Sequence, residues 1–354
     1  MKPPVESNSS FVCPLPTSPD SQTVSLAHGE GGRLTRQFIR ERIVSRFSNE
    51  TLAALGDAAL ITVGSERIAF SSDGYTVTPL FFPGGDIGRL AVFGTVNDLA
   101  VTGAVPRWIG LSMIIEEGLA WSVVDRILDS VQAAARQTNV TVVTGDTKVV
   151  PRGTCDGMFI TTSGIGEIVT PVGTGPSSLQ VGDVLIVSGP VGRHGAAIMN
   201  AREDLGFDPS PISDCASVAT PLIELHRTSL TPRAVRDATR GGVAAVLHEW
   251  SEASGLSCSI EESLIPVSTE VRAVCELLGL DPLHLANEGT FVLATSHHQV
   301  DSTLNLLKHF EVTRDARIIG EVVPRRIVPV VLRRSIGSDV PLDDPAGAPL
   351  PRIC

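Results

Sequence analysis

The amino-acid sequence predicts a mixed α/β protein of two domains, in the α/β or α+β class. Short β-branched runs alternate irregularly with longer amphipathic segments, which is typical of strands and helices packed together. The chain has 354 residues, about twice the ~150 residues of an ordinary domain. A stretch rich in glycine, proline and serine at 170–178 interrupts the pattern near its middle, and we expect the domain boundary there.

These features divide the chain into four segments. Residues 1–22 are rich in proline, serine and threonine, so we expect a disordered extension. An N-terminal domain is expected at 23–170 and a C-terminal α/β domain at 178–334. Residues 335–354 carry several prolines and glycines without periodicity, which predicts a flexible C-terminal tail.

In the N-terminal domain, apolar side chains recur at helical spacing over 34–47, which predicts one amphipathic helix. Two longer helices are expected at 86–103 and 122–137. The expected strands are the β-branched runs Ala59–Val63, Arg67–Ser71, Thr76–Pro79, Ile109–Ile115, Val140–Val143 and Gly157–Gly166.

The C-terminal domain repeats the alternation. Its expected strands are Asp183–Val187, Ser257–Ile260, Phe291–Thr295 and Ile318–Val323. Its expected helices lie near Gly195–Ala201, Val218–His226, Gly242–Ser254, Thr269–Leu278 and His298–His309.

Composition limits the partners. With 28 basic and 39 acidic residues the formal charge is −11, which argues against a nucleic-acid-binding surface. The six cysteines form no C-x-x-C pair, so we expect neither a zinc ribbon nor a disulfide framework. No apolar run has the length of a membrane span or the form of a signal peptide. We therefore expect a cytoplasmic protein without a membrane partner.

Acidic residues beside glycines are the main candidates for chemistry. Asp57, Asp73, Asp146 and Asp237 each stand in such a context. Any one of them alone is most simply an ordinary turn, where Asp and Gly are favoured for backbone reasons. Their number favours a functional site.

Asp98 lies in a predicted helix whose apolar positions point in every direction, which indicates burial on most sides. Asn97 and Asp98 then have no solvent-exposed face of the helix on which to lie. A buried carboxylate needs a partner or a metal ion. Capping of a neighbouring backbone turn and metal coordination are both compatible with this position.

Lys148 is one of only three lysines among the 28 basic residues. It stands in a G-D-T-K segment that we interpret as a turn, where an ammonium group suits phosphate oxygens or proton transfer; an exposed turn residue without function is the alternative. Gly31-Gly32 and Gly84-Gly85 are glycine loops that precede predicted helices. Backbone N–H groups at such starts can bind phosphate.

Cys354 ends the predicted tail. About 18 residues from position 337 could span roughly 60 Å when extended, enough to carry a thiol between sites. An accidental terminal cysteine is the alternative.

Five motifs together resemble one known family. They are the run from Ser71 to Pro106, GDTKVVP (145–151), DATRGG (237–242), LANEG (285–289) and the terminal PRIC. The combination is similar to the HypE family of hydrogenase maturation factors. HypE-family proteins are carbamoyl dehydratases within a larger family that includes aminoimidazole ribonucleotide synthetase and selenophosphate synthetase. The resemblance covers roughly residues 28–354.

This resemblance implies an aminoimidazole ribonucleotide synthetase-like fold with mixed sheets, and a homodimer. It implies ATP and Mg²⁺ as cofactors. The implied partners are the carbamoyltransferase HypF, which loads a carbamoyl group on the terminal cysteine, and the iron-carrying HypC–HypD complex. The implied reaction dehydrates the thiocarboxamide to a thiocyanate, whose cyano group goes to the iron of a [NiFe]-hydrogenase.

The resemblance also implies site residues. The implied magnesium ligands are Asp57, Asp73, Asp98 and Asp237. The implied nucleotide-binding residues are Gly31, Gly32, Gly84, Gly85, Asn97, Asp146 and Thr147. The implied catalytic residues are Cys354 as carrier, Lys148 for charge neutralisation or proton transfer, and Glu288 as candidate general base. Glu288 could equally be a structural carboxylate or help to position the tail.

The match has departures. The family commonly reads Gly-Asp-His-Gly where this chain has Gly192-Arg193-His194-Gly195, and the surroundings of His284 also differ. We therefore assign no role to His194 or His284. Two other functions stay open: a non-enzymatic maturation scaffold, and another ATP-dependent enzyme of the larger family that acts on a small diffusible acceptor.

Overall fold

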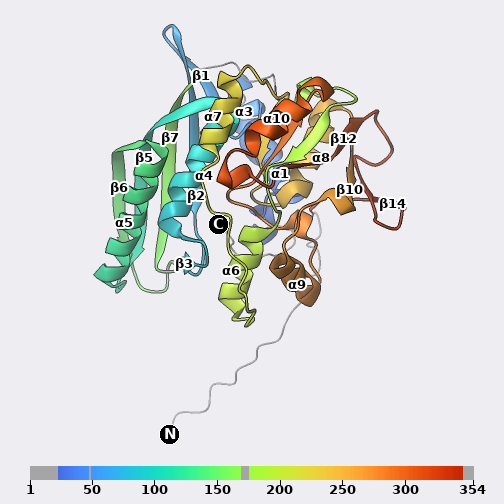
Figure 1. Cartoon of the computed structure of the whole chain (residues 1–354). Helices are drawn as coiled ribbons and strands as arrows, with labels where there is room; N and C mark the ends of the chain where they lie inside the picture. The colour runs from blue at the N-terminus through green and yellow to red at the C-terminus, as the bar shows by residue number, and fades with distance from the viewer. Residues whose placement is uncertain (1–22, 48, 169–174, 346–354) are drawn as a thin grey trace.

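The computed structural model contains a five-stranded sheet, a seven-stranded sheet, a two-stranded hairpin and the helices that pack around them (Figure 1). The structure describes residues 23–47, 49–168 and 175–345. The expected extension at 1–22, most of the expected boundary stretch and the terminal Cys354 lie outside the described residues.

The N-terminal domain is built on a five-stranded sheet in which β5 and β6 run parallel and the other neighbours antiparallel. In sheet order the strands are β1 (Ala59–Val63), β2 (Glu66–Tyr75), β7 (Met158–Ile168), β5 (Ala104–Glu116) and β6 (Thr141–Val150). Helix α5 (Trp121–Thr138) makes the crossover that the parallel pair requires. A small hairpin joins β3 (Phe81–Phe82) to β4 (Gly85–Asp86).

Helix α4 (Ile87–Val101) is the centre of the molecule. Asp86 caps it by accepting hydrogen bonds from the N–H groups of Gly88 and Arg89. Of its 15 residues, 13 are buried, because it contacts β2 and β7 of one domain and α7 and β9 of the other. One hydrophobic core therefore extends from Tyr75 in the first domain to Ala316 in the second.

The C-terminal domain has a seven-stranded sheet in which only β10 and β13 are parallel neighbours. In sheet order the strands are β14 (Asp339–Pro341), β13 (Val330–Arg333), β10 (Ser257–Glu261), β12 (Arg317–Val323), β8 (Val184–Val187), β11 (Phe291–Thr295) and β9 (Ala234–Asp237). Its α-helices are α6 (Arg193–Glu203), α7 (Ala219–Arg227), α8 (Gly242–Ser254), α9 (Thr269–Leu278) and α10 (Val300–Leu307). Short 3₁₀ turns connect elements at Leu26–His28, Pro176–Ser178, Glu262–Leu264, Pro282–His284 (η5), His297–Gln299 and Glu311–Thr313.

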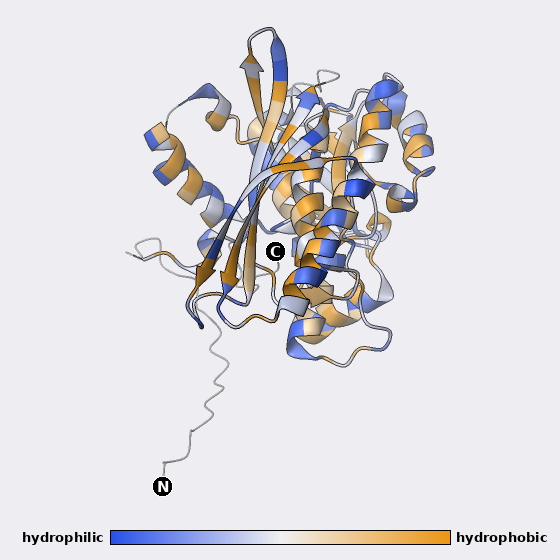
Figure 2. Ribbon diagram, turned by 90° about the vertical axis from the view of Figure 1, so that its left-hand side faces the viewer, coloured by the Kyte–Doolittle hydropathy of each residue, from blue (hydrophilic) through white to orange (hydrophobic). Residues whose placement is uncertain are grey.

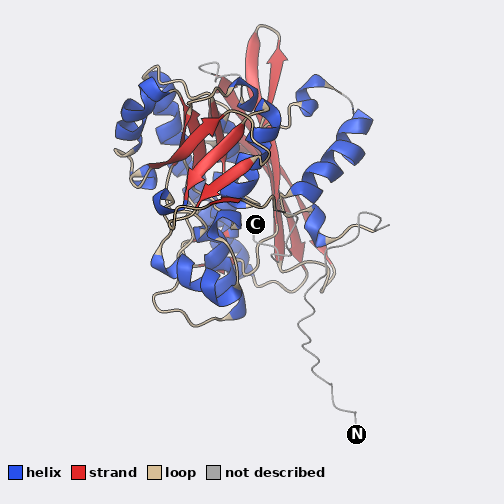
Figure 3. Cartoon of the chain, turned by 90° about the vertical axis from the view of Figure 1, so that its right-hand side faces the viewer, coloured by secondary structure: helices blue, strands red, loops and turns tan. Residues whose placement is uncertain are grey.

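The helix predicted at 34–47 is present, but it is not one regular α-helix. It comprises α1 (Arg33–Phe38), a π-helical stretch (Ile39–Val44) and α2 (Ser45–Phe47), followed by the short α3 (Glu50–Ala53). None of the residues in these elements is buried. The run stands away from the sheets and carries hydrophobic and hydrophilic residues along its length (Figures 2 and 3).

Several local interpretations of the sequence were wrong. Residues 76–79 form no strand, and the segment 145–148 is not a turn but the middle of β6. Asp73 likewise lies within strand β2. Strands β9, β13 and β14 were not predicted; β14 falls in the segment expected to be a flexible tail and pairs with β13. These strands are short, so their sequences offer too few residues to show an alternation.

Candidate active site

Three carboxylates from distant parts of the chain meet where the domains join. Asp57 precedes β1, Asp98 lies on α4 and Asp237 ends β9. One oxygen from each lies within 4.8 Å of the others. The meeting follows from the fold, because α4 packs against β2 on one side and β9 on the other. We call Asp57, Asp98 and Asp237 the acidic cluster.

Burial disfavours the ionised form of the three carboxyl groups in the acidic cluster. It raises the pKa of Asp57 to about 6 and that of Asp237 to about 8, and neighbouring carboxylates add to the effect in both. The pKa of Asp98 is raised well above its usual range by burial, then by the charge of Asp73. A cation among these oxygens would relieve the repulsion, and an all-oxygen donor set suits Mg²⁺. The residues present thus fit the expected metal.

The contacts of Asp98 favour the metal-ligand interpretation over the turn cap. The hydroxyl of Ser71 on β2 donates to Asp98 Oδ2 at 2.7 Å. Asp73, two residues further along β2, accepts a longer hydrogen bond of 3.4 Å from Thr95 Oγ1. Asp73 therefore lies beside the acidic cluster, close enough to affect the pKa of each member.

Arg236 holds the acidic cluster from the C-terminal domain. Its Nε lies 3.2 Å from Asp57 Oδ1, and its Nη1 lies 3.1 Å from Glu249 Oε2 on α8. Neither Arg236 nor Glu249 was predicted as a site residue from the sequence. Arg236 directly precedes the DATRGG motif, and that adjacency was the available signal.

Glu288 is buried in the loop before β11. Burial raises its pKa well above the usual range, and the charges of Asp214 and then Asp237 raise it further. Asp214 shapes this loop, because its carboxylate accepts hydrogen bonds from the N–H groups of Glu288 and Gly289 and from Thr290 Oγ1 at 2.8–3.1 Å. Asp214 is a third site residue that was not predicted from the sequence, since no motif marks it.

Asn97 connects the two domains. Its amide donates to the carbonyl oxygens of Ala216 and Glu288 and accepts from the N–H of Val218, at 2.8–3.3 Å. Both amide N–H groups are thereby engaged within the protein. The structure gives Asn97 the role of fixing the loops at 216–218 and 288 against α4.

The predicted glycine loops are sites of close backbone approach. Gly31 has φ +79°, and a Cβ there would come within 2.6 Å of the carbonyl oxygen of Arg240. Gly32 is the N-cap of α1. The Gly31–Gly32 loop therefore packs against the turn that follows Asp237. Gly84 and Gly85 turn between β3 and β4, and a Cβ at Gly84 would lie 2.6 Å from the carbonyl oxygen of Ser213.

Asp146, Thr147 and Lys148 lie apart from the acidic cluster on the exposed edge strand β6. Lys148 Nζ and Asp146 Oδ2 form a solvent-exposed ion pair of 3.0 Å. The register aligns Asp73 with Gly145 across β7 and β5, through Thr162 and Leu111. Because side chains alternate along a strand, Asp146 and Lys148 point to the opposite face from Asp73.

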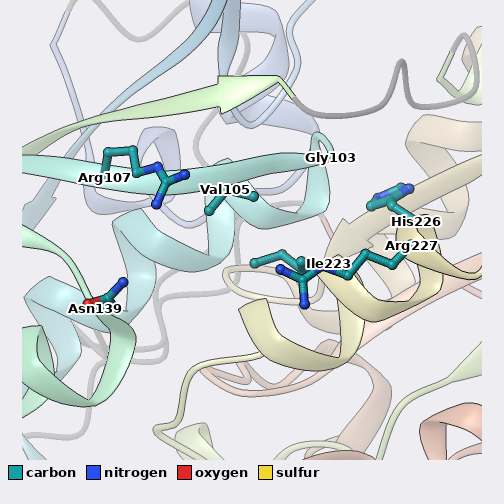
Figure 4. A pocket seen from close by; sticks show the side chains of 7 residues that line it. All are labelled: Gly103, Val105, Arg107, Asn139, Ile223, His226 and Arg227. Atoms are coloured by element: carbon teal, nitrogen blue, oxygen red, sulfur yellow. The ribbon is translucent and has the colours of Figure 1, made fainter.

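Two cavities lie elsewhere. One of about 330 Å³ opens between the start of β5 and α7 (Figure 4) and contains none of the predicted site residues. A cleft of about 660 Å³ borders the loop that carries Glu288. Its lining includes Arg193, Asp214, Ser217, Thr290 and Arg314.

Comparisons with known proteins identify the family. Residues 55–168 match the N-terminal domain and residues 180–332 the C-terminal domain of the AIR synthase related proteins. The carbamoyl dehydratase HypE of Escherichia coli (strain K12) is 46% identical over 336 residues, which cover 94% of this chain and 99% of that protein. The chain belongs to the HypE family.

Solved HypE structures confirm the predicted fold. The HypE of a HypE–HypF complex matches with a TM-score of 0.82 and 40% identity, covering 87% of this chain and 99% of that one. A HypE in complex with ATP matches with a TM-score of 0.76 and 39% identity, covering 94% of this chain and 100% of that one. The two-domain, mixed-sheet fold inferred from the HypE motifs is therefore correct. In the described part of this chain, every helix is too short or too polar to cross a membrane.

Proposed function

We propose that this chain is an ATP-dependent carbamoyl dehydratase that converts a thiocarboxamide on Cys354 into a thiocyanate for [NiFe]-hydrogenase maturation. The observation that carries the proposal is the acidic cluster, formed at the domain junction of a HypE-family chain that ends in PRIC. The protein named HypE in the ATP complex supports ATP as the second substrate.

The chemistry balances with ATP alone. The amide oxygen of Cys–S–C(=O)–NH₂ is a poor leaving group until it takes the γ-phosphoryl group of ATP, which leaves ADP. Loss of the two N–H protons and of the oxygen as phosphate then forms the C≡N bond. Each turnover thus removes one water from the carrier, and that water's oxygen ends in phosphate.

The protein's part is positioning and charge control. We assign Asp57, Asp98 and Asp237 as the groups that would hold Mg²⁺, with Asp73 beside them; the ion would neutralise phosphate charge. The Gly31–Gly32 loop, packed on the turn after Asp237, would face the nucleotide.

Glu288 is the proposed proton acceptor. Burial, and then the charges of Asp214 and Asp237, raise its pKa well above the usual range, which favours its protonated form in the metal-free chain. A cation bound at Asp237 would lower the pKa of Glu288. Glu288 would then lose its proton and become able to act as a base. Glu288 could then accept a proton from the substrate nitrogen.

We further propose that the active protein is a homodimer. On the face of the five-stranded sheet turned away from α4, Phe70, Ile165 and Trp108 are aligned across β2, β7 and β5. Phe70 and Trp108 are exposed. Such a patch fits a second copy of this chain. Asp146, Thr147 and Lys148 would then serve the partner's nucleotide.

The HypE–HypF complex among the related structures supports HypF as the protein that loads Cys354. The HypC–HypD complex is the proposed acceptor of the cyano group. Since the terminal thiol must stay reduced to be loaded, we place the protein in the cytoplasm.

Intact mass spectrometry tests the function. The chain is incubated with HypF, carbamoyl phosphate and Mg-ATP, alongside Cys354→Ala and the matched thiol control Cys13→Ala. We expect the wild type and Cys13→Ala to gain one carbamoyl group and then lose one water, and Cys354→Ala to stay unchanged.

An unchanged wild-type mass with an active HypF would contradict the carrier role and favour the scaffold. ATP turnover on a free small amide by Cys354→Ala would instead favour the diffusible-acceptor enzyme.

A further inference from the structure

The chain is held at four consecutive residues after its last strand. Leu342 is buried, its N–H donates to the carbonyl oxygen of Val330, and its own carbonyl oxygen accepts from His248 Nε2, both at 3.0 Å. The carbonyl oxygen of Asp343 accepts from His284 Nε2, also at 3.0 Å. Two histidines, on α8 and in η5, thus hold adjacent backbone carbonyls.

Helix α1 holds the next two residues. Arg36 Nη2 donates to Asp344 Oδ2 at 2.6 Å, and the N–H of Arg33 donates to the carbonyl oxygen of Pro345 at 2.7 Å. The side chains of Arg36 and Asp344 are only 14% and 25% exposed. Because removal of one member of a partly buried charge pair leaves the other uncompensated, loss of the Arg36 side chain would weaken this contact.

These contacts lie next to the candidate active site. Arg36 Nη1 is 3.9 Å from Glu249 Oε1, and the other oxygen of Glu249 pairs with Arg236, which pairs with Asp57. Arg33 directly follows the Gly31–Gly32 loop. A continuous row of alternating charges therefore joins Asp344 to the acidic cluster.

We propose that residues 342–345 are a fixed tail anchor and that Arg36, His248 and His284 are positioning residues for the terminal cysteine. The contacts of Arg36, His248 and His284 with residues 342–345 were not predicted from the sequence. The consequence for catalysis rests on the proposed function of Cys354; the anchor itself does not.

The tail anchor sets the reach of the thiol. Nine residues follow Pro345, and at about 3.4 Å per residue they span at most ~31 Å. A tail free from position 337 would reach about 60 Å. The tail anchor halves the distance that the thiol can reach, and it fixes the start of the tail beside the acidic cluster. Both effects raise the effective concentration of the loaded thiol at that site.

A spin label directly after the tail anchor tests its existence without any catalytic assay. The label is attached to Ala346→Cys in the full chain, with Cys13→Ser and Cys354→Ser removing the other thiols outside the described core. We expect Arg36→Ala to narrow the label's spectrum as local motion increases.

Two variants control this measurement. Arg40→Ala removes an ion pair to Glu252 that also joins this helical run to α8 but does not touch 342–345, and we expect the wild-type spectrum. Arg36→Lys should restore much of the order, because only one guanidinium nitrogen contacts Asp344. Equal spectra for the wild type and Arg36→Ala would overturn the anchor.

A single-turnover experiment tests the positioning role. With Cys354 carbamoylated beforehand by HypF, Arg36→Ala should dehydrate its own tail about 3- to 10-fold more slowly than the wild type. The same substitution in a Cys354→Ala chain should leave unchanged the dehydration of an S-carbamoylated peptide ending in PRIC, supplied in excess.

The outcomes separate the two proposals. An equal loss with the tethered and the free substrate would mean structural damage and overturn the positioning role. If the loaded wild type never loses water, the proposed function fails, whereas the spin-label result still decides whether the tail anchor exists.

Discussion

The acidic cluster and strand β6 both carry predicted site residues. These two regions differ in burial and in charge pairing. Asp57, Asp98 and Asp237 meet at the domain junction with raised pKa values, and Arg236 forms an ion pair with Asp57. Asp146 and Lys148 lie on an exposed edge strand and neutralise each other in solvent. The residues of the acidic cluster come together within one chain, whereas those of β6 lie on a strand that is exposed in the part of the chain that the structure describes.

The G-D-T-K segment lies at an exposed sheet edge, where Asp146 and Lys148 point away from Asp73. We propose that this segment joins the acidic cluster of another copy of the chain. The exposed Trp108 beside it is consistent with such a copy. Three experiments, taken from the largest expected effect to the smallest, test this contrast.

Removal of one carboxylate of the acidic cluster should have the largest effect. We expect Asp98→Asn to lower carbamoyl-dependent ATP turnover about 100- to 1,000-fold. The substitution removes a preorganised negative charge from the proposed Mg²⁺ site, where the ion would neutralise phosphate charge. Asp129→Asn, on the exposed face of α5, is the matched control and should retain full turnover. Normal release of phosphate by Asp98→Asn would contradict the assignment of Asp98 as a metal ligand.

Mixed dimers should distinguish a shared site from a separate one. Asp98→Asn and Lys148→Ala chains, each inactive as a homodimer, are unfolded together and refolded as a mixture. If each site takes Asp98 from one chain and Lys148 from the other, half of the dimers contain one intact site. Activity should then recover to about a quarter of the wild-type value.

If both residues act within one chain, no mixed dimer contains an intact site. The mixture would then stay as inactive as its components, and the proposed contribution of β6 to the partner's site would be rejected. Refolded wild-type protein supplies the reference activity.

The smallest effect should be a pH-dependent stabilisation by Mg²⁺. Carboxyls whose pKa is raised on folding bind extra protons in the folded state, so the stability of the metal-free chain falls as pH rises from about 4 towards 8. Protons and Mg²⁺ compete for the same oxygens. We expect Mg²⁺ to raise Tm about 3 °C more at pH 8.5 than at pH 6.

Differential scanning fluorimetry of Asp98→Asn and Asp129→Asn provides the check. The first should lose the pH-dependent part of the Mg²⁺ shift, and the second should keep it. A shift that is the same at both pH values would show that the metal binds elsewhere.

Much of the fold was predictable because its elements are locally determined. β1, β11, α8 and α9 have the predicted bounds, since long periodic or β-branched runs report their own structure. The buried character of α4 was likewise predicted from its apolar residues. By contrast, the start of β6 was predicted as a strand but its residues 145–148 were interpreted as a turn because Gly145 and Asp146 favour turns, whereas pairing with β5 overrides that preference.

The sequence by itself determined the family and the residue types able to bind a metal, because these are properties of local motifs. Only the tertiary structure decided that Asp57, Asp98 and Asp237 meet, that Lys148 points to the opposite face, and that the chain is held through Pro345. The physical reason is that such proximities depend on packing and strand register between residues tens to hundreds of positions apart. A one-residue change of register reverses the face on which a side chain lies.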